Sequence, residues 1–116
     1  MTDKISPEKS KEEYALIIST INSLEEAEKL AELLVKEKTA ACVSVSSPVL
    51  SIYRWRENVE TEKEVMLFIK TTRDNFPKVE RLILENHSYE VPEIIAIPIL
   101  YGEKRYLNWL SANTGP

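Results

Sequence analysis

The chain contains few of the residues from which catalytic and metal sites are most often built. Its 116 residues include one histidine, His87, and one cysteine, Cys42. A single cysteine cannot form an intramolecular disulfide, so packing or association between chains must stabilise the fold. The two glycines, Gly102 and Gly115, stand apart, so no glycine-rich loop is available to cradle a phosphate group. Because no Ser/His/Asp or Cys/His pairing has support from its local context, we expect a protein that is not an enzyme.

Long apolar runs and clusters of positive charge are also missing. Hydrophobic residues make up 43% of the chain and charged residues 29%, but no apolar run is long enough to span a bilayer. The net charge is −4, and no run of Lys and Arg offers the clustered cations that phosphate binding needs. Residues 1–13 are polar and lack the apolar stretch of a secretory signal. We therefore expect a cytoplasmic protein with neither nucleic-acid nor membrane partners.

The length of the chain favours one domain. Residues 1–12 are rich in Lys, Glu and Ser, which predicts a flexible N-terminal tail, and residues 13–114 then form the domain. Ser23 and Glu26 form a capping box at the start of a helix, and Pro48 predicts an edge or bulge within one long strand or between two collinear ones. The expected elements are a strand at 14–19, a helix at 23–38, a long hairpin at 41–72 with its turn at 57–60 and its second strand at 63–71, a helix capped by Asp74 or Asn75, a strand at 94–100 in which Pro98 implies an edge or bulge, and a short helix at 103–111.

This order of elements, β-α-β-β-α-β followed by a short C-terminal helix, predicts a fold of the α+β class. The specific expectation is a ferredoxin-like sandwich with both main helices on one face of the sheet. The hairpin is longer than such a domain needs, and it would leave Tyr53, Trp55 and Phe68 on an exposed ribbon. We therefore predict an obligate oligomer in which the hairpin pairs with another chain.

Several short motifs resemble those of a known family. They are Ala40-Ala41-Cys42-Val43, Tyr53-Arg54-Trp55, Glu64 ahead of Ile69-Lys70-Thr71-Thr72, the segment from His87 to Glu93, and Pro98 ahead of Tyr106-Leu107-Asn108-Trp109-Leu110. In order and spacing these motifs, over residues 14–112, resemble the CutA family of divalent-cation tolerance proteins. The resemblance implies a ferredoxin-like protomer, a homotrimer whose long hairpins pair across subunits, and a link to copper and other divalent cations.

The resemblance also bears on where a metal would bind. In some bacterial members a cysteine at the end of the first strand and two adjacent histidines are assigned as copper ligands. The corresponding residues here are Ser19 and the pair Asn86-His87, so His87 alone remains. We predict that a site for copper or another divalent cation would combine His87 with the carboxylates of Glu90 and Glu93. The alternative is that His87 caps the preceding helix or forms local hydrogen bonds.

A second group of candidates consists of aromatic and charged side chains. They either line a cleft between subunits or pack in the core and the subunit interface. For Glu64, Lys70 and Glu93, a structural ion pair and a polar pocket floor both stay open. Cys42 lies between Ala41 and Val43 with no cation before it, so we expect a buried small hydrophobe rather than a reactive thiolate. The cleft or interface candidates are Tyr53, Trp55, Glu64, Lys70, Tyr89, Tyr106 and Trp109.

Two functions are consistent with these patterns. The first, which the resemblance implies, is a trimeric protein of the CutA type that binds divalent cations, copper first, and takes part in the response to metal ions. The second is a trimeric small-molecule sensor or interaction scaffold with its ligand in the clefts between subunits.

Overall fold

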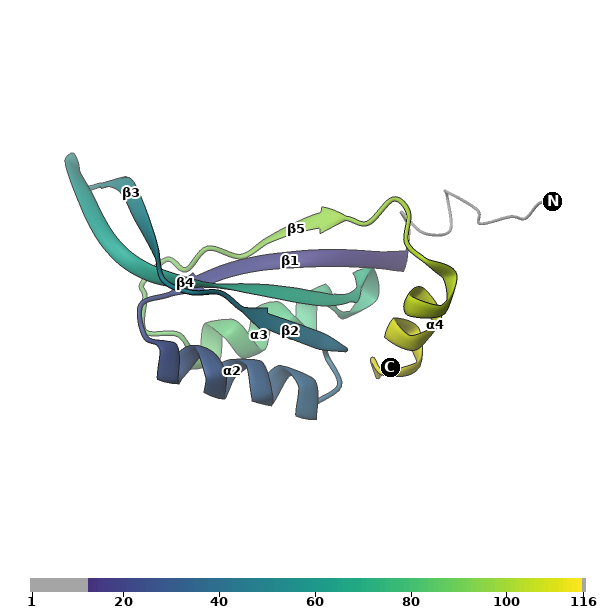
Figure 1. The fold of residues 1–116 in the computed structure, drawn as a ribbon. Helices are drawn as coiled ribbons and strands as arrows, with labels where there is room; N and C mark the ends of the chain where they lie inside the picture. Colours follow the sequence, from purple (N-terminus) through teal and green to yellow (C-terminus); the bar gives the residue numbers. More distant parts are fainter. Residues whose placement is uncertain (1–12, 116) are drawn as a thin grey trace.

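The computed structural model describes residues 13–115, so the tail expected at residues 1–12 lies outside the described residues. The elements follow one another in the expected order, with the predicted hairpin divided into three strands (Figure 1). They are β1 (Tyr14–Ile21), α2 (Leu24–Lys36), β2 (Cys42–Val45), β3 (Val49–Trp55), β4 (Asn58–Thr72), the 3-10 turn η1 (Arg73–Asn75), α3 (Phe76–Asn86), β5 (Ile95–Pro98) and α4 (Lys104–Ala112).

Local sequence explains where the two main helices begin. Ser23 caps α2, since its side chain accepts a hydrogen bond from the Glu26 amide at 3.2 Å, as the capping box predicts. Asn75 precedes α3, but its side chain does not cap the helix and instead donates to the Thr72 hydroxyl at 2.7 Å. Asn75 is thus the N-cap residue, one of the two expected, but it caps α3 without a side-chain hydrogen bond to the helix. Proline in the first turn of α3 supplies the start signal, because its fixed φ suits a helix and its missing N–H has no partner there.

The strands form one antiparallel sheet in the order β2-β4-β1-β5, and β3 extends it by pairing with the first half of β4. Helices α2 and α3 cover the same face of this sheet, while α4 lies at its end (Figure 1). This arrangement confirms the ferredoxin-like α+β fold. Strand β5 lies at an edge of the sheet. Pro98 has no N–H group, and an edge strand tolerates this because one of its sides has no neighbouring strand to bond.

The hairpin differs from its expected boundaries. It turns at Arg56 and Glu57, where Trp55 pairs with Asn58, and not over residues 57–60. The φ angles of Arg56 and Glu57 are 51° and 76°, the positive values that a two-residue type I′ turn requires. Sequence reasoning missed this turn because neither residue is Gly, Asn or Asp. It also placed the start of β4 too late, because the charged residues that open the strand carry no hydrophobic alternation.

Pro48 divides the first arm of the hairpin into β2 and β3, as predicted. Val45 pairs with Leu67, and Val49 pairs with Glu64. The first arm thus advances by four residues while β4 advances by three, so the first arm contains one extra residue, a β-bulge. A bulge bends the strand that contains it and increases the local twist. The paired β3 and β4 ends accordingly curve away from the rest of the sheet (Figure 1).

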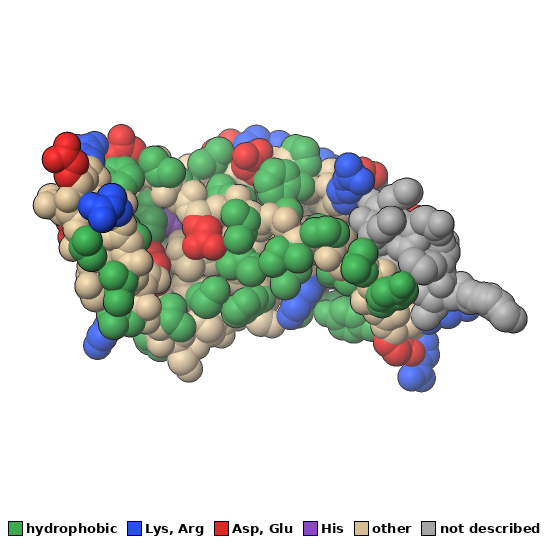
Figure 2. Space-filling view, turned by 90° about the horizontal axis from the view of Figure 1, so that it is seen from above, with side chains coloured by type: hydrophobic (Ala, Val, Ile, Leu, Met, Phe, Trp, Pro, Cys, Tyr) green, Lys and Arg blue, Asp and Glu red, His purple; other side chains and the backbone are tan. Residues whose placement is uncertain are grey.

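The two faces of the sheet have different surroundings. Ile17, Leu67 and Ile69 point toward the helices and are fully buried in the main core. On the opposite face, register places Leu16 beside Ile97 and Ile18 between Ile95 and Phe68. Ile95 and Ile97 are 48% and 43% exposed. Hydrophobic side chains gather over this face, which Figure 2 shows from above, and we call it the open sheet face. It is defined by Leu16, Ile18, Met66, Phe68, Ile95 and Ile97.

A candidate acidic and aromatic pocket

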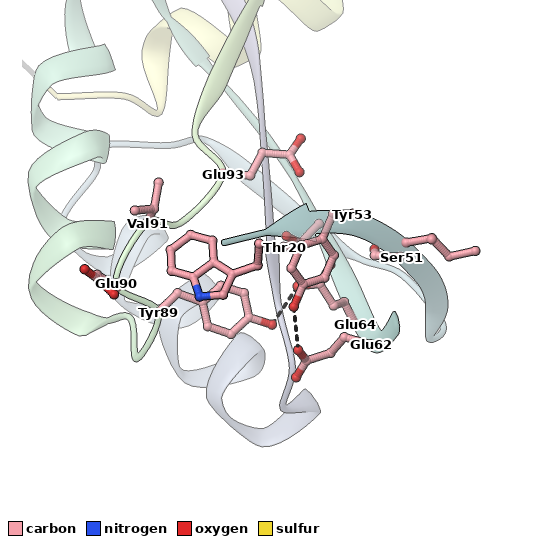
Figure 3. Close-up of a pocket in the computed structure, with 11 residues that line it drawn as sticks. Thr20, Ser51, Tyr53, Glu62, Glu64, Tyr89, Glu90, Val91 and Glu93 are labelled. Atoms are coloured by element: carbon pink, nitrogen blue, oxygen red, sulfur yellow. Dashed lines mark hydrogen bonds between the residues drawn. The ribbon is translucent and has the colours of Figure 1, made fainter. Parts of the chain in front are cut away.

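A pocket of about 560 Å³ lies between the β3-β4 hairpin and the loop that follows α3 (Figure 3). We call it the hairpin pocket. Three aromatic side chains and four carboxylates dominate its lining. They are Tyr53, Trp55, Tyr89, Glu62, Glu64, Glu90 and Glu93.

Strand alternation explains how the hairpin supplies its share of this lining. Tyr53 and Trp55 are two residues apart on β3, as are Glu62 and Glu64 on β4, so each pair points to one face of its strand. Ser51 pairs with Glu62 across the hairpin, which places the two sets on the same face. The hairpin thus presents aromatic rings from one strand and carboxylates from the next to the loop that carries Tyr89.

The Tyr89 hydroxyl connects the loop to the hairpin. It donates a 2.6 Å hydrogen bond to the carboxylate of Glu64, which is only 7% exposed (Figure 3). Burial raises the pKa of the Tyr89 phenol, and the hydrogen bond to Glu64 and its negative charge raise that pKa further. The phenol therefore keeps its proton and remains a donor. Glu64 lines the hairpin pocket and forms no ion pair within the part of the chain that the structure describes.

A second tyrosine holds the neighbouring carboxylate. The Tyr53 hydroxyl donates to one oxygen of Glu62 at 3.1 Å, and the Asn22 side-chain amide donates to the other at 2.9 Å. Partial desolvation raises the pKa of Tyr53, and the bond to Glu62 adds to the shift. Both pocket tyrosines therefore donate to carboxylates from their protonated forms, and neither neutralises the charge it contacts.

A positive group lies at the rim of the hairpin pocket. The Arg56 guanidinium lies 3.2 Å from a Glu90 oxygen, and both side chains are largely exposed. The same guanidinium lies 5.3 Å from the centroid of the Trp55 ring, within cation–π range. Arg56 directly follows Trp55 and lies in the tight turn, so its side chain reaches the rim of the pocket.

His87 supports the pocket from outside its lining. Its Nε2 lies 2.7 Å from the Thr20 carbonyl oxygen, and its Nδ1 accepts a 3.1 Å hydrogen bond from the Tyr89 amide. These partners fit a neutral ring with the proton on Nε2, which donates to Thr20. In this conformation neither nitrogen has a free lone pair for a metal. The ring also packs against Tyr89, with centroids 4.5 Å apart, so His87 positions Tyr89.

The described part of the chain contains no cluster of three His, Cys, Asp or Glu side chains arranged to hold a metal ion. Glu90 and Glu93 line the hairpin pocket, whereas His87 is occupied by its hydrogen bonds. A metal site that combines these three residues remains a prediction, and it requires His87 to release a partner.

Three other candidates lie away from the hairpin pocket. Lys70 pairs with Cys42 across β4 and β2, and its ammonium group donates to the Ser44 hydroxyl at 2.9 Å. Tyr106 and Trp109 pack against each other on α4, with ring centroids 5.6 Å apart. The structure thus separates Lys70 from Glu64 and Glu93, with which the sequence had grouped it.

The surroundings of Cys42 also differ from the expectation. The thiol is only partly buried, and the Lys70 ammonium group lies 3.8 Å from its sulfur. The expectation of a buried thiol without a neighbouring cation is therefore wrong. It relied on residues adjacent in sequence, whereas the cation comes from the paired strand.

Sequence reasoning did not single out several residues of the hairpin pocket. Glu62 is the most important, since it contacts both Tyr53 and Asn22. Correct hairpin register would have found it, because Glu62 faces Ser51 on the same side as Tyr53. Val91 offered no comparable signal, because its place in the pocket depends on how the connection from α3 to β5 approaches the hairpin. The other residues missed are Thr20, Ser51, Ile52 and Val91.

Fold and pocket together define a small ferredoxin-like protein with an extended hairpin and a negatively charged candidate ligand site. The sequence model of the family described as "CutA1 divalent ion tolerance protein" matches residues 15–113. The chain therefore belongs to the CutA family, whose description names ion tolerance and no reaction. No helix of the described residues is long and apolar enough to cross a membrane.

Individual relatives agree with this assignment. The chain is 45% identical over 100 residues to the divalent-cation tolerance protein CutA of Thermus thermophilus, a match that covers 86% of this chain and 97% of the relative. It is 37% identical over 99 residues to the chloroplastic CutA protein of Arabidopsis thaliana, covering 85% of this chain and 54% of that longer one. The crystal structure of CutA1 from Shewanella sp. SIB1 superposes with a TM-score of 0.88 at 40% identity, covering 91% of this chain and 99% of the other.

Proposed function

We propose that the protein is a homotrimer that binds divalent cations, copper first, and that it serves divalent-cation tolerance by binding rather than by catalysis. The observation that carries this proposal is the charge of the hairpin pocket. Four carboxylates line it, and no Lys, Arg or His is among its lining residues in the described chain. Such a site attracts cations and repels anions. The family description and the names of the relatives supply the class of cation.

The trimeric state is supported by the apolar surface that the described residues of one chain leave uncovered. The open sheet face carries six apolar side chains on β1, β4 and β5. Further out, Ile52 and Val59 on the hairpin are 66% and 65% exposed. Exposed apolar surface on this scale marks an interface in most soluble proteins. Light scattering should give a mass three times the 13.3 kDa of the chain, and a monomer at micromolar concentration would contradict the proposal.

For the metal we propose ligation by Glu90 and Glu93, with His87 as the imidazole ligand that copper favours. His87 would have to exchange its hydrogen bond from Tyr89 for the metal, which predicts weak binding. Calorimetry with Cu(II) on the wild type, His87→Ala and Glu93→Gln tests the assignment. The matched control is Glu28→Gln, because Glu28 is an exposed carboxylate on α2 outside the hairpin pocket.

The Cu(II) isotherms separate the two kinds of ligand. Weaker binding in both site variants, with the control unchanged, would support the three-residue site. Weaker binding in Glu93→Gln alone would leave a carboxylate site and remove His87 from it. Wild-type isotherms in both site variants would refute the site.

A second function, the small-molecule sensor or scaffold with its ligand in clefts between subunits, is favoured by the volume and the aromatic walls of the hairpin pocket. A volume of about 560 Å³ falls within the range of small-molecule sites and exceeds the needs of one metal ion. Native mass spectrometry of freshly purified protein distinguishes the two functions. A copurified organic mass on the trimer supports the sensor, and a metal mass supports the first proposal.

We also propose a cytoplasmic location. The name of the Arabidopsis relative places that protein in chloroplasts, so at least one member of the family occupies another compartment. Fractionation of the source cells, with antibody against this chain, tests the proposal. Recovery outside the cytoplasmic fraction would overturn it.

A further inference from the structure

The hairpin pocket has an unbalanced negative charge. Glu62 and Glu64 at its floor accept hydrogen bonds from tyrosine hydroxyls and an asparagine amide, which are neutral donors. The Arg56 guanidinium contacts Glu90 only at the exposed rim, where solvent screens the pair. An incoming ligand therefore meets a pocket whose lining, in the described residues, has four carboxylates and no cationic side chain.

The walls of the hairpin pocket suit a cation that carries hydrocarbon. The rings of Tyr53, Trp55 and Tyr89 offer electron-rich faces to a cation and apolar area to carbon. The protein already uses this combination for a cation of its own, since Arg56 lies 5.3 Å from the Trp55 ring centroid and bonds Glu90. A hydrated metal ion would gain nothing from these apolar surfaces.

The carboxylates also retain acceptors for N–H donors. One Glu64 oxygen accepts from Tyr89, and its other oxygen accepts no hydrogen bond from the described residues. Glu93 likewise accepts none from that part of the chain, although it lines the same pocket (Figure 3). Both oxygens of Glu62 are occupied, by Tyr53 and Asn22. The free oxygen of the buried Glu64 carboxylate suits an ammonium group, because N–H bonds to carboxylates are charge-assisted.

We infer that the hairpin pocket binds a small organic amine in its protonated form, with the ammonium group on the free oxygen of Glu64 and the hydrocarbon against Tyr53, Trp55 and Tyr89. The four carboxylates are spread along the walls, and they form no cluster of three for a metal among the described residues. A cation with an apolar body uses both the charge and the aromatic walls.

The test compares two probes of nearly equal shape, the cation benzylammonium and the neutral benzyl alcohol. Each is titrated into the full chain near neutral pH, with binding followed by calorimetry. Benzylammonium should bind at least about tenfold more tightly, because only it has a charge and N–H donors for the carboxylates. Equal affinities would show that the hairpin pocket recognises apolar surface alone and would overturn the inference, as would no benzylammonium binding at millimolar concentration.

Two variants test the contacts. Glu64→Gln keeps an acceptor for the Tyr89 hydroxyl and removes the charge, so benzylammonium should bind about tenfold more weakly and benzyl alcohol should be unaffected. Trp55→Leu removes an aromatic wall and should weaken benzylammonium by about threefold or more. Glu28→Gln on α2 makes the same charge change outside the pocket and should bind as the wild type does. Wild-type affinity in both pocket variants would overturn the inference, provided circular dichroism shows both are folded.

This inference rests on the hairpin pocket being the ligand site proposed above, but it concerns another class of ligand. Titration of Cu(II) into the same samples separates the two claims. Copper binding without benzylammonium binding would refute the amine and leave the metal proposal standing. Benzylammonium binding without copper binding would refute the metal proposal and leave the amine inference standing.

Discussion

The hydrogen bond between Tyr89 and Glu64 provides a sharp test of how the hairpin pocket is held together. Tyr89→Phe removes one oxygen atom and leaves the Glu64 carboxylate, 7% exposed, without its 2.6 Å donor. Loss of a hydrogen bond to a charged group costs about 1.5–3 kcal/mol of unfolding free energy. Because Tyr89 is only partly buried, water can replace part of the lost interaction, and we expect the lower end, about 1.5 kcal/mol.

The assay is urea unfolding at one fixed protein concentration, since the stability of an oligomer depends on concentration. Tyr53→Phe is the matched control, because it deletes a hydroxyl that bonds Glu62, a carboxylate less buried than Glu64, at 3.1 Å. The control should leave the unfolding midpoint almost unchanged. A loss below about 0.5 kcal/mol in Tyr89→Phe, or a loss equal to that of the control, would refute the reasoning that burial makes this hydrogen bond strong.

The same hydrogen bond predicts a pH dependence. The pKa of Tyr89 is raised above its ordinary value of 10.0, so above that pH the unfolded chain releases the phenol proton while the folded chain retains it. The contribution of Tyr89 to stability is therefore complete below pH 10.0 and is lost as pH rises through the folded-state pKa. The wild type should lose stability above pH 10 more steeply than Tyr89→Phe. Parallel stability curves for the two proteins would contradict this expectation.

Three further predictions concern the fold and assembly. Replacing Arg56 with Asn and Glu57 with Gly relieves positive φ angles in the hairpin turn and should stabilise the protein by about 1 kcal/mol; a lower melting temperature would contradict the turn assignment. Ile97→Asp places a charge on the open sheet face and should shift the mass in light scattering toward the monomer, whereas Leu84→Asp, at a 54% exposed position on α3, should not. Ser23→Ala removes the cap of α2 and should cost about 1 kcal/mol in urea unfolding; an unchanged midpoint would show that the cap is dispensable.

Local patterns predicted most of the fold because they act over a few residues. The capping box at Ser23 and the apolar period that follows it located α2 to within two residues at its C-terminal end. Pro48 correctly marked the break between β2 and β3. The turn at Arg56 and Glu57 was missed because its conformation is imposed by pairing of the flanking strands against the preference of the two residues.

The hairpin pocket was predicted in part. Tyr53, Trp55, Glu64, Tyr89, Glu90 and Glu93 were all candidates, and the structure places all six in its lining. All six line one pocket, although they had been divided between a metal group and a cleft group. Lys70 was misplaced for the same reason that the setting of Cys42 was misjudged, since the contact between them crosses from β4 to β2.

The sequence by itself determined the kind and order of the elements, the family and the scarcity of imidazole and thiol ligands, because each depends on residue identity and short spacing. Only the tertiary structure decided that the two nitrogens of His87 are used by Thr20 and Tyr89, which are 67 and 2 residues away. It alone brought Tyr89 onto Glu64, 25 residues distant, and so made a charged pocket from a loop and a hairpin. Such contacts depend on strand register and on the curvature of the hairpin, which no local pattern encodes.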